Sequence, residues 1–405
     1  MEKLQNKIPI VRFPEFKDEW EHKELNELLR ESKKKNVELK YNKKEVLSVS
    51  GELGIVNQIE HLGRSYAGVS VHNYGVVEIG DIVYTKSPLK ANPYGIIKIN
   101  KGKAGIVSTL YAVYKINEKT AYGDFVEYYF SLDANTNRYL RPLVRKGAKN
   151  DMKINNEYVL HDRIFASNIS EQKRIAHFFT VLDKKINELK EKKALLEEYK
   201  KGVMQKIFSQ EIRFKDDDGN VFPEWEEKKI GKMADINPEN GELPKSFIYI
   251  DLESVEKGRL NKNERISVED APSRARRLLR QNDILFQMVR PYQRNNFFFE
   301  MKSTDYVAST GYAQIRTKNN ALFLYQLLHT DNFVMKVVKY CTGTGYPAIN
   351  SSDLSKITIS FPSIPEQIKI ANFLSKIDDK VKTVTEQMEE IKEYKKGLLQ
   401  KMFCV

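Results

Sequence analysis

Arginine, glutamine and asparagine gather in one stretch of the chain that carries almost no acid. Residues 271–296 contain six arginines and a single acidic residue, Asp283. A guanidinium donates two parallel hydrogen bonds to the edge of guanine or to a phosphate, and amide groups suit other base edges. The pattern predicts contact with nucleic acid. The candidates are Arg274, Arg276, Arg277, Arg290, Tyr292, Arg294 and Asn295, with Thr344 and Tyr346 from a glycine-containing loop that follows the helical stretch at 321–340.

Basic residues also gather at three places in the first half of the chain. Residues 33–44 contain six lysines, residues 84–94 follow a segment (IGDIVY) that resembles the one before the arginine loop (QNDILF), and residues 145–153 are basic again. For any one group, a solvated basic face without a ligand remains an alternative. The recurrence after the same predicted strand favours binding. The candidates are Lys33, Lys34, Lys35, Tyr84, Lys86, Ser87, Lys90, Asn92, Tyr94, Arg145, Lys146 and Lys149.

The overall charge agrees with a polyanionic partner. Lys and Arg number 67 against 55 Asp and Glu in 405 residues, which gives a net charge of +12 and a pI near 9.2. This excess favours nucleic acid first and an acidic membrane surface second. Composition alone leaves open a basic protein that has neither partner.

Patterns typical of catalysis and of metal binding are missing from the sequence. There is no phosphate loop G-x-x-x-x-G-K-[ST], no H-E-x-x-H, no G-x-S-x-G and no G-x-G-x-x-G. The histidines do not share metal-ligand spacing, and two cysteines, Cys341 and Cys404, are too few for a disulfide framework. No stretch has the length of a signal peptide core or of a membrane span. We therefore expect a non-catalytic cytoplasmic protein without a metal site.

A long internal repeat organises the chain and must position the basic groups. Residues 169–208 and 364–403 align without a gap and are identical at 17 of 40 positions. A Phe-Pro-Glu sequence with a tryptophan, Trp20 or Trp225, precedes the variable body of each copy. The expected ranges are a globular domain at 12–168, a helix at 169–208, a second globular domain at 213–363 and a second helix at 364–405.

Both repeated segments are typical of coiled-coil helices. Apolar residues recur at alternating steps of four and three over four to five heptads, interrupted by Lys193 and Lys200 in the first copy and by Lys395 in the second. Neither helix buries its apolar stripe alone, so we expect the two to pack on each other in antiparallel directions. Two amphipathic helices that pack on separate domains are the alternative.

The bodies between the repeats have mixed secondary structure. Short β-rich runs alternate with Gly, Pro and Asn turn signals, and aromatic-rich helical stretches follow at 121–132 and 321–340. The expected fold class is mixed α/β (α+β), with two globular domains joined by two long antiparallel coiled-coil helices and an internal two-fold repeat.

The whole pattern resembles the specificity subunits of type I restriction–modification enzymes. The most specific elements are Glu171-Gln172 with Glu366-Gln367, and the Glu-Tyr-Lys-Lys-Gly sequences at 198–202 and 393–397. The resemblance covers essentially the whole chain. It implies that the globular domains are target recognition domains, each reading one half of a split DNA site. It further implies that the helices set the spacer and bind two methyltransferase subunits.

The resemblance also implies a division of labour. Restriction motor-nuclease subunits would join the same core, and S-adenosylmethionine, ATP and magnesium would belong to the partner subunits, so no cofactor is expected on this chain. A DNA-modifying enzyme with a cryptic active site and a coiled-coil scaffold that binds only proteins are the alternatives. The helix residues assigned to partner binding are Glu171, Gln172, Tyr199, Lys200, Glu366, Gln367, Tyr394 and Lys395.

Overall fold

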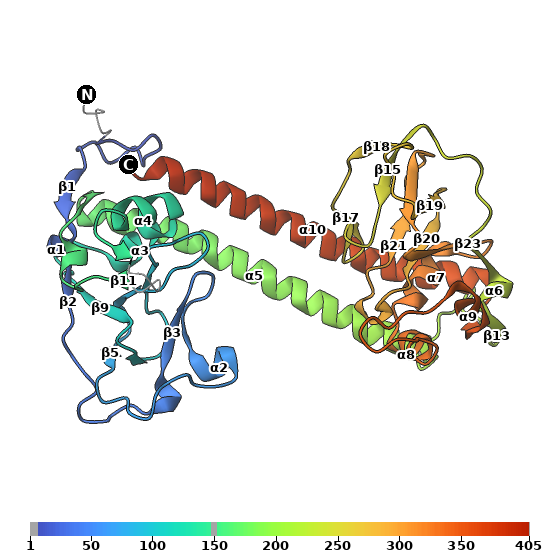
Figure 1. Cartoon of the computed structure of the whole chain (residues 1–405), viewed down its shortest axis with the longest axis horizontal. Helices are drawn as coiled ribbons and strands as arrows, with labels where there is room; N and C mark the ends of the chain where they lie inside the picture. The colour runs from blue at the N-terminus through green and yellow to red at the C-terminus, as the bar shows by residue number, and fades with distance from the viewer. Residues whose placement is uncertain (1–6, 147–151, 405) are drawn as a thin grey trace. The chain divides into compact units, whose positions relative to one another are not determined.

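The computed structural model describes residues 7–146 and 152–404. Their contacts form two units: unit 1 comprises Met1–Lys190 with Glu386–Val405, and unit 2 comprises Glu191–Thr385. Two long helices, α5 (Ile169–Phe208) and α10 (Ile364–Met402), each contribute one part to either unit (Figure 1). The mixed α/β fold class expected from the sequence is confirmed, but the contacts do not set the helices apart as separate domains.

The body of unit 1 precedes α5 in the sequence. Its elements are β1 (Glu21–Glu24), α1 (Leu25–Leu28), β2 (Leu29–Glu31), η1 (Lys43–Glu45), β3 (Leu47–Ser50), β4 (Gly54–Asn57), α2 (Gln58–Leu62), β5 (Gly75–Val77), β6 (Ile82–Thr85), β7 (Ile97–Ile99), β8 (Gly105–Val107), β9 (Tyr111–Ile116), α3 (Gly123–Ser131), α4 (Asp133–Leu140), β10 (Arg145–Lys146), β11 (Met152–Lys153), η2 (Tyr158–Leu160) and β12 (Arg163–Ala166).

The body of unit 2 lies between the two long helices in the sequence. Its elements are β13 (Glu226–Lys229), α6 (Ile230–Met233), β14 (Ala234–Ile236), β15 (Ser246–Ile250), β16 (Val255–Glu256), β17 (Arg259–Leu260), β18 (Arg265–Ser267), β19 (Ala275–Leu278), β20 (Asp283–Gln287), η3 (Pro291–Gln293), β21 (Phe297–Phe299), β22 (Tyr306–Ser309), β23 (Tyr312–Thr317), α7 (Ala321–Leu328), α8 (Asp331–Val338), α9 (Ser351–Lys356) and β24 (Thr358–Phe361).

Both bodies build the same four-stranded antiparallel sheet. The strand order is β2-β9-β6-β7 in unit 1 and β14-β23-β20-β21 in unit 2. A two-stranded ribbon, β1 with β12 or β13 with β24, closes each body just before its long helix. The internal repeat therefore extends to the strands of the bodies, where only fragments of sequence align.

The remaining strands differ between the units. Unit 1 adds three antiparallel pairs among the described residues, β3 with β4, β5 with β8 and β10 with β11. Unit 2 adds a second four-stranded sheet, β18-β15-β22-β19, in which β15 and β22 run parallel, and the antiparallel pair β16 with β17. The shared sheet is thus the frame of each unit, and the added strands and their loops are where the units diverge.

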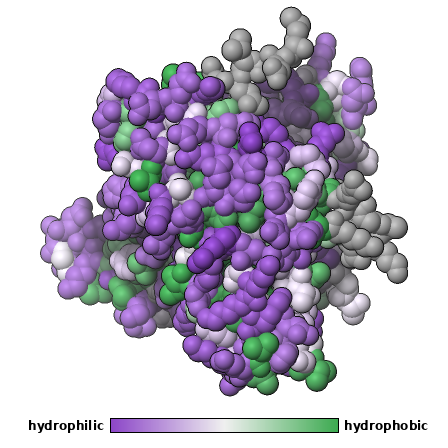
Figure 2. All heavy atoms as spheres, turned by 90° about the vertical axis from the view of Figure 1, so that its left-hand side faces the viewer, coloured by the Kyte–Doolittle hydropathy of each residue, from purple (hydrophilic) through white to green (hydrophobic). Residues whose placement is uncertain are grey.

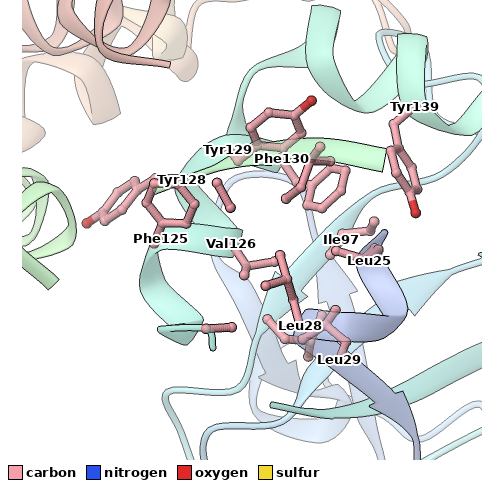
Figure 3. Packing of buried hydrophobic residues seen from close by; sticks show 14 of the residues in the cluster. Leu25, Leu28, Leu29, Ile97, Phe125, Val126, Tyr128, Tyr129, Phe130 and Tyr139 are labelled. Carbon is pink, nitrogen blue, oxygen red and sulfur yellow. The ribbon is translucent and has the colours of Figure 1, made fainter. Parts of the chain in front are cut away.

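Aromatic helices attach each shared sheet to the long helices. In unit 1, Phe125 of α3 is buried, and its ring centroid lies 5.2 Å from that of Phe403, which directly follows α10. Figure 3 shows the adjoining side of this core, where Leu28 of α1 and Ile97 of β7 face Val126 of α3. The body and the helices of unit 1 therefore share one core. Burial of each such side chain stabilises the fold by roughly 1.5–3 kcal/mol.

The long helices pack in antiparallel directions within each unit. In unit 1, Phe179 near the start of α5 belongs to the same core as Met402 at the end of α10. In unit 2, Ile207 near the end of α5 belongs to the same core as Ile370 near the start of α10. The apolar seam expected from the heptads is therefore buried by helix-on-helix packing.

Two of the lysines that interrupt the heptad pattern form ion pairs across the seam. In unit 2, the Lys200 Nζ lies 2.6 Å from Asp378 Oδ1, and in unit 1 Lys395 pairs with Asp183. The lysines are 195 residues apart, as are the aspartates, so the two pairs are equivalent under the sequence repeat. A charged residue inside a coiled-coil seam fixes the register of the helices when it finds its partner in only one alignment.

Candidate nucleic-acid interface

The two loops that the sequence singled out in unit 2 lie against each other. The 288–296 loop follows β20, and the 342–348 loop follows α8. Val289 and Ala348 join them in an isolated antiparallel bridge. Candidate residues that are far apart in the sequence therefore share one surface.

Arg290 is fixed by both its backbone and its side chain. Its φ of +53° and ψ of +54° lie in the left-handed region, and its N–H donates to the Pro347 carbonyl at 2.7 Å. Its guanidinium Cζ lies 4.2 Å from the ring centroid of Tyr346, which is 69% exposed. A cation over an aromatic face gains about 0.5–1 kcal/mol at an exposed site. The arginine is held on the outside of unit 2.

Arg294 lies at the other end of the 3-10 turn η3 and is engaged within the chain. Its backbone is also left-handed, with φ of +56°. Its Nη2 forms an ion pair with Asp331 at the start of α8, and this bond lowers the pKa of the Asp331 carboxyl. Because its charge already has a partner, Arg294 anchors the loop to α8.

The buried side chain of Gln287 holds the 288–296 loop from below. Its backbone N–H donates to Asn296 Oδ1 at 2.9 Å, and its Oε1 accepts from the Asn295 N–H at 3.0 Å. Its Nε2 donates to Gln293 Oε1 at 2.9 Å. Three bonds from one residue thus determine the path of the loop, and Asn295 is half-buried rather than freely exposed.

His329 of unit 2 lies beneath the same loop. Its Nδ1 lies 2.8 Å from the Tyr325 carbonyl and donates to it, so its Nε2 faces the Asn296 amide nitrogen at 3.5 Å as an acceptor. Burial lowers the pKa of His329 to about 4. The ring is therefore neutral at neutral pH, which suits an amide donor.

The other predicted residues of unit 2 differ in exposure. Arg274, Arg276 and Thr344 are exposed, and Tyr292 is 50% exposed. Arg277 on β19 is half-buried, its Nε has no hydrogen-bond partner among the described residues, and burial lowers its pKa. An unpartnered guanidinium favours an anion that the chain itself does not supply.

The lysines of residues 33–35 and Lys90 are exposed on unit 1. Lys34 forms an ion pair with Glu78 at 2.8 Å, which raises its pKa. No ion pair of Lys33, Lys35 or Lys90 is found within the described ranges. These three cations face solvent.

Lys86 of unit 1 is only partly accessible. Its Nζ donates to Asn156 Oδ1 at 3.0 Å. Burial lowers the pKa of Lys86, and the positive charge of Lys35 lowers it further. The structure therefore brings together two basic stretches that are separate in the sequence.

Two of the predicted contacts in unit 1 belong to the interior instead. Tyr84 is fully buried, its hydroxyl donates to the Tyr94 carbonyl at 2.8 Å, and burial raises its pKa. Asn92 is buried at a turn closed by Gly95, whose φ is +91° and whose Cβ position lies 2.0 Å from a backbone oxygen. Tyr84 and Asn92 are thus structural, while Ser87 and Tyr94 are half-buried.

The third basic group of unit 1 is only partly described. Arg145 and Lys146 form β10, which pairs with β11. Lys149 lies outside the described residues.

Sequence reasoning missed an arginine that stacks on a tyrosine in unit 1. Arg64 Cζ lies 4.6 Å from the ring centroid of Tyr66, and both residues are exposed. The Tyr66 N–H donates to Gln58 Oε1 at 2.9 Å. In the sequence, the two residues appear only as an arginine and a tyrosine two positions apart after Gly63. This pattern is too common to identify a binding site.

The two glutamates assigned to partner binding are buried inside their own units, and that assignment is wrong. Glu171 lies 2.7 Å from Arg12, and Glu366 lies 3.0 Å from Arg213. Both carboxylates are 0% exposed. Each arginine comes from the segment that enters a body, so the pair ties this segment to the start of a long helix.

The adjacent glutamines are also internal, so their assignment to partner binding is wrong. Gln172 donates to the Ser167 carbonyl at 2.8 Å, and Gln367 donates to the Pro362 carbonyl at 2.9 Å. Their Oε1 atoms accept backbone N–H groups that precede α3 and α7. The repeated Glu-Gln pair is therefore a joint between body and helix.

Two of the remaining helix candidates face solvent. Tyr199 is 54% exposed on unit 2, and Tyr394 is 58% exposed on unit 1. Lys200 and Lys395 form the seam ion pairs and are about one-fifth exposed, 20% and 19%. The equivalent tyrosines are thus accessible, whereas the equivalent lysines lie mostly within the seam.

The described ranges show no group of three or more His, Cys, Asp or Glu side chains that could hold a metal ion. Across the same ranges, no helix is both long and apolar enough to cross a membrane. The face drawn in Figure 2 is mainly hydrophilic, with hydrophobic residues in small separate groups. Charged and polar chemistry dominates this face.

Comparisons with known proteins agree on one family. Residues 223–393 match the model of the type I restriction modification DNA specificity domain. The HindI specificity subunit of Haemophilus influenzae is 25% identical over 143 residues, which are 34% of this chain and 31% of that protein. The putative MjaX specificity subunit of Methanocaldococcus jannaschii is 24% identical over 267 residues, 63% of this chain and 62% of that protein. The matches thus span less than two thirds of either relative.

Solved structures share the fold over nearly the whole length. The type I restriction–modification S subunit from M. genitalium has a TM-score of 0.59 at 13% identity, covering 98% of this chain and 99% of that chain. A chain from a study of complex assembly and conformational transition of the type I R-M system has a TM-score of 0.52 at 17% identity, covering 95% and 97%. The chain is thus similar to type I restriction–modification specificity subunits, through the family model over residues 223–393 and through relatives of 24–25% identity.

Proposed function

We propose that this chain is the non-catalytic DNA-recognition subunit of a type I restriction–modification complex in the cytoplasm. Each unit reads one half of a bipartite DNA site with its own loops. The observation that carries the proposal is the duplication: the same four-stranded sheet occurs twice, and different basic loops project from each copy. A repeated sheet whose exposed loops differ between the two units suits a protein that recognises two unrelated half-sequences of DNA.

The contacts that we propose combine positioning and reading. Exposed cations such as Lys33, Lys90 and Arg274 supply phosphate contacts, which hold a duplex in register without reading it. The 288–296 loop supplies base contacts, because bonds within unit 2 determine its shape. A loop that is ordered before binding loses less conformational entropy when it meets DNA.

The partners of this subunit are two methyltransferase subunits and the restriction motor-nuclease subunits. Tyr199 and Tyr394 support a pair of equivalent docking sites, since each exposes an aromatic ring at the same position of the repeat. Aromatic residues are enriched at protein interfaces. The partners would hold S-adenosylmethionine, ATP and magnesium and carry out the chemistry.

Exchange of one body tests the proposal. Residues 25–162, bracketed by β1 and β12, are replaced by the corresponding body of another specificity subunit, and the chain is expressed with its partners. Methylated adenines in the cellular DNA are then mapped. We expect one half of the recognised sequence to change and the other half to stay.

The reciprocal exchange of residues 230–357 in unit 2 is the matched control. It should change the other half-sequence only. Two-reader recognition would be disproved if either exchange altered both halves together.

A further inference from the structure

We propose that Arg290 reads a guanine in the half-site bound by unit 2, and that Tyr346 is the residue that positions its guanidinium. This inference rests on the proposed function and adds to it the identity of one base and the side chain that recognises it. The carrying observation is a guanidinium that packs on the Tyr346 ring yet has no hydrogen-bond or ion-pair partner among the described residues.

Three contacts restrict Arg290. Its N–H donates to Pro347, the neighbouring Val289 is bridged to Ala348, and its guanidinium lies 4.2 Å from the Tyr346 ring centroid. Long arginine side chains lose up to about 2 kcal/mol of rotamer entropy when they are ordered. The contact with Tyr346 supplies part of that side-chain ordering before any ligand binds.

The guanidinium of Arg290 nevertheless has unused donors. Its Nε has no hydrogen-bond partner, and no ion pair or side-chain hydrogen bond of Arg290 is found among residues 152–404. Arg294, at the other end of η3, differs because it pairs with Asp331. The Nε of Arg290 is buried, so its Nη groups are the donors that remain for an external acceptor.

Guanine is the acceptor that fits this arrangement. Its O6 and N7 accept two parallel hydrogen bonds from one guanidinium, which is the commonest specific contact between protein and DNA. The ring of Tyr346 packs on one face of the planar Arg290 guanidinium. The edge of the guanidinium is left to donate two parallel hydrogen bonds to guanine. A phosphate could also accept from this edge, so the test must separate a base from a phosphate.

The experiment uses the full chain in complex with its methyltransferase partners and a pool of duplexes with randomised half-sites. Wild type first defines the bipartite sequence, and Arg290→Lys and Arg290→Ala are then selected on the same pool. Lysine keeps the charge but not the bidentate fork. We expect both variants to lose about 5- to 140-fold discrimination at one G·C position of one half-site, with the other positions intact.

Tyr346 and a distant arginine provide the controls. Tyr346→Ala should weaken discrimination at the same position, while Tyr346→Phe retains the ring and should restore it. Arg265→Lys alters an arginine on β18 that is paired with Asp305 and should leave the selected sequence unchanged.

The outcomes separate this inference from the proposed function. If the wild-type complex selects no sequence, the proposed function fails. If it selects a bipartite site and Arg290→Lys keeps every preference, or Arg290→Ala weakens all sequences alike, Arg290 binds a phosphate or nothing and the inference is overturned. A wild-type half-site for unit 2 without any G·C pair would overturn it too.

Discussion

His329 is a buried titratable group whose charge state bears on the stability of unit 2. Burial lowers its pKa to about 4 in the folded chain, whereas an unfolded histidine titrates near 6.5. Below pH 6.5 the unfolded state therefore binds more protons than the folded state. By linkage, the stability that the neutral ring supports is complete above about pH 6.5 and is lost as the pH falls towards 4.

At pH 4, we expect His329 to lower the free energy of unfolding of unit 2 by up to about 3 kcal/mol, since one pKa unit corresponds to about 1.4 kcal/mol. Urea unfolding can be followed by Trp225 in a Trp20→Phe background, because the chain has two tryptophans and Trp20 lies in unit 1. His329→Gln should flatten the dependence of the urea midpoint between pH 6.5 and 4, and exposed His177→Gln should not. Equal slopes in wild type and His329→Gln would contradict the assignment.

Residue types alone predicted candidates of which the structure leaves some exposed and buries others. Arg290 and Tyr346 were singled out because arginine and aromatic side chains suit base contacts, and the structure leaves both accessible to a ligand. Tyr84 and Glu171 were misassigned, because their burial depends on partners from distant segments, such as Arg12. A motif repeated twice is as compatible with a structural joint as with a binding surface.

At the scale of elements, each seam ion pair is also bonded to the body of its unit. In unit 1 the Tyr128 hydroxyl of α3 donates to Asp183 at 2.7 Å, and in unit 2 the Gln326 amide of α7 donates to Asp378 at 2.8 Å. Different side chains thus make the same connection in both copies. We infer that these aspartates fix the helix register and connect each body to its helix pair.

Charge reversal tests the seam pair of unit 2. Lys200→Glu places two acids opposite each other and should lower the urea midpoint of the Trp225 signal, while adding Asp378→Lys should recover part of the loss. Because Asp378 is 43% exposed, we expect a coupling free energy of only about 0.5–1 kcal/mol. Exposed Lys201→Glu is the matched control. Additive effects of the two changes would show that the pair does not stabilise unit 2.

Heptad periodicity predicted the helices but could not identify the partners of their lysines. The pattern reports which residues of one helix share a face, and Lys200 and Lys395 appear in it only as interruptions. Their aspartates lie on the other helix, at positions that depend on direction and register. Likewise, the common sheet order of the two bodies arises from strands whose sequences have diverged.

At the scale of the whole molecule, the proposed spacer role of α5 and α10 makes a prediction about length. We would remove seven residues between Asp183 and Lys200 in α5 and seven between Asp378 and Lys395 in α10. Each unit then keeps its own ion pair, and a whole heptad preserves the apolar seam. At about 1.5 Å per residue, each helix shortens by about 10 Å.

A base pair advances about 3.4 Å along the duplex, so this deletion should shorten the preferred spacer by up to about three base pairs. The two half-sequences should stay the same, because neither body is altered. Insertion of a heptad at the same places should lengthen the spacer by a similar amount, which guards against a deletion that merely inactivates the complex. Mapping of methylated adenines in cells measures both. If either variant is active with the wild-type spacer, helix length does not determine the spacing of the half-sites, and α5 and α10 act only in packing and partner binding.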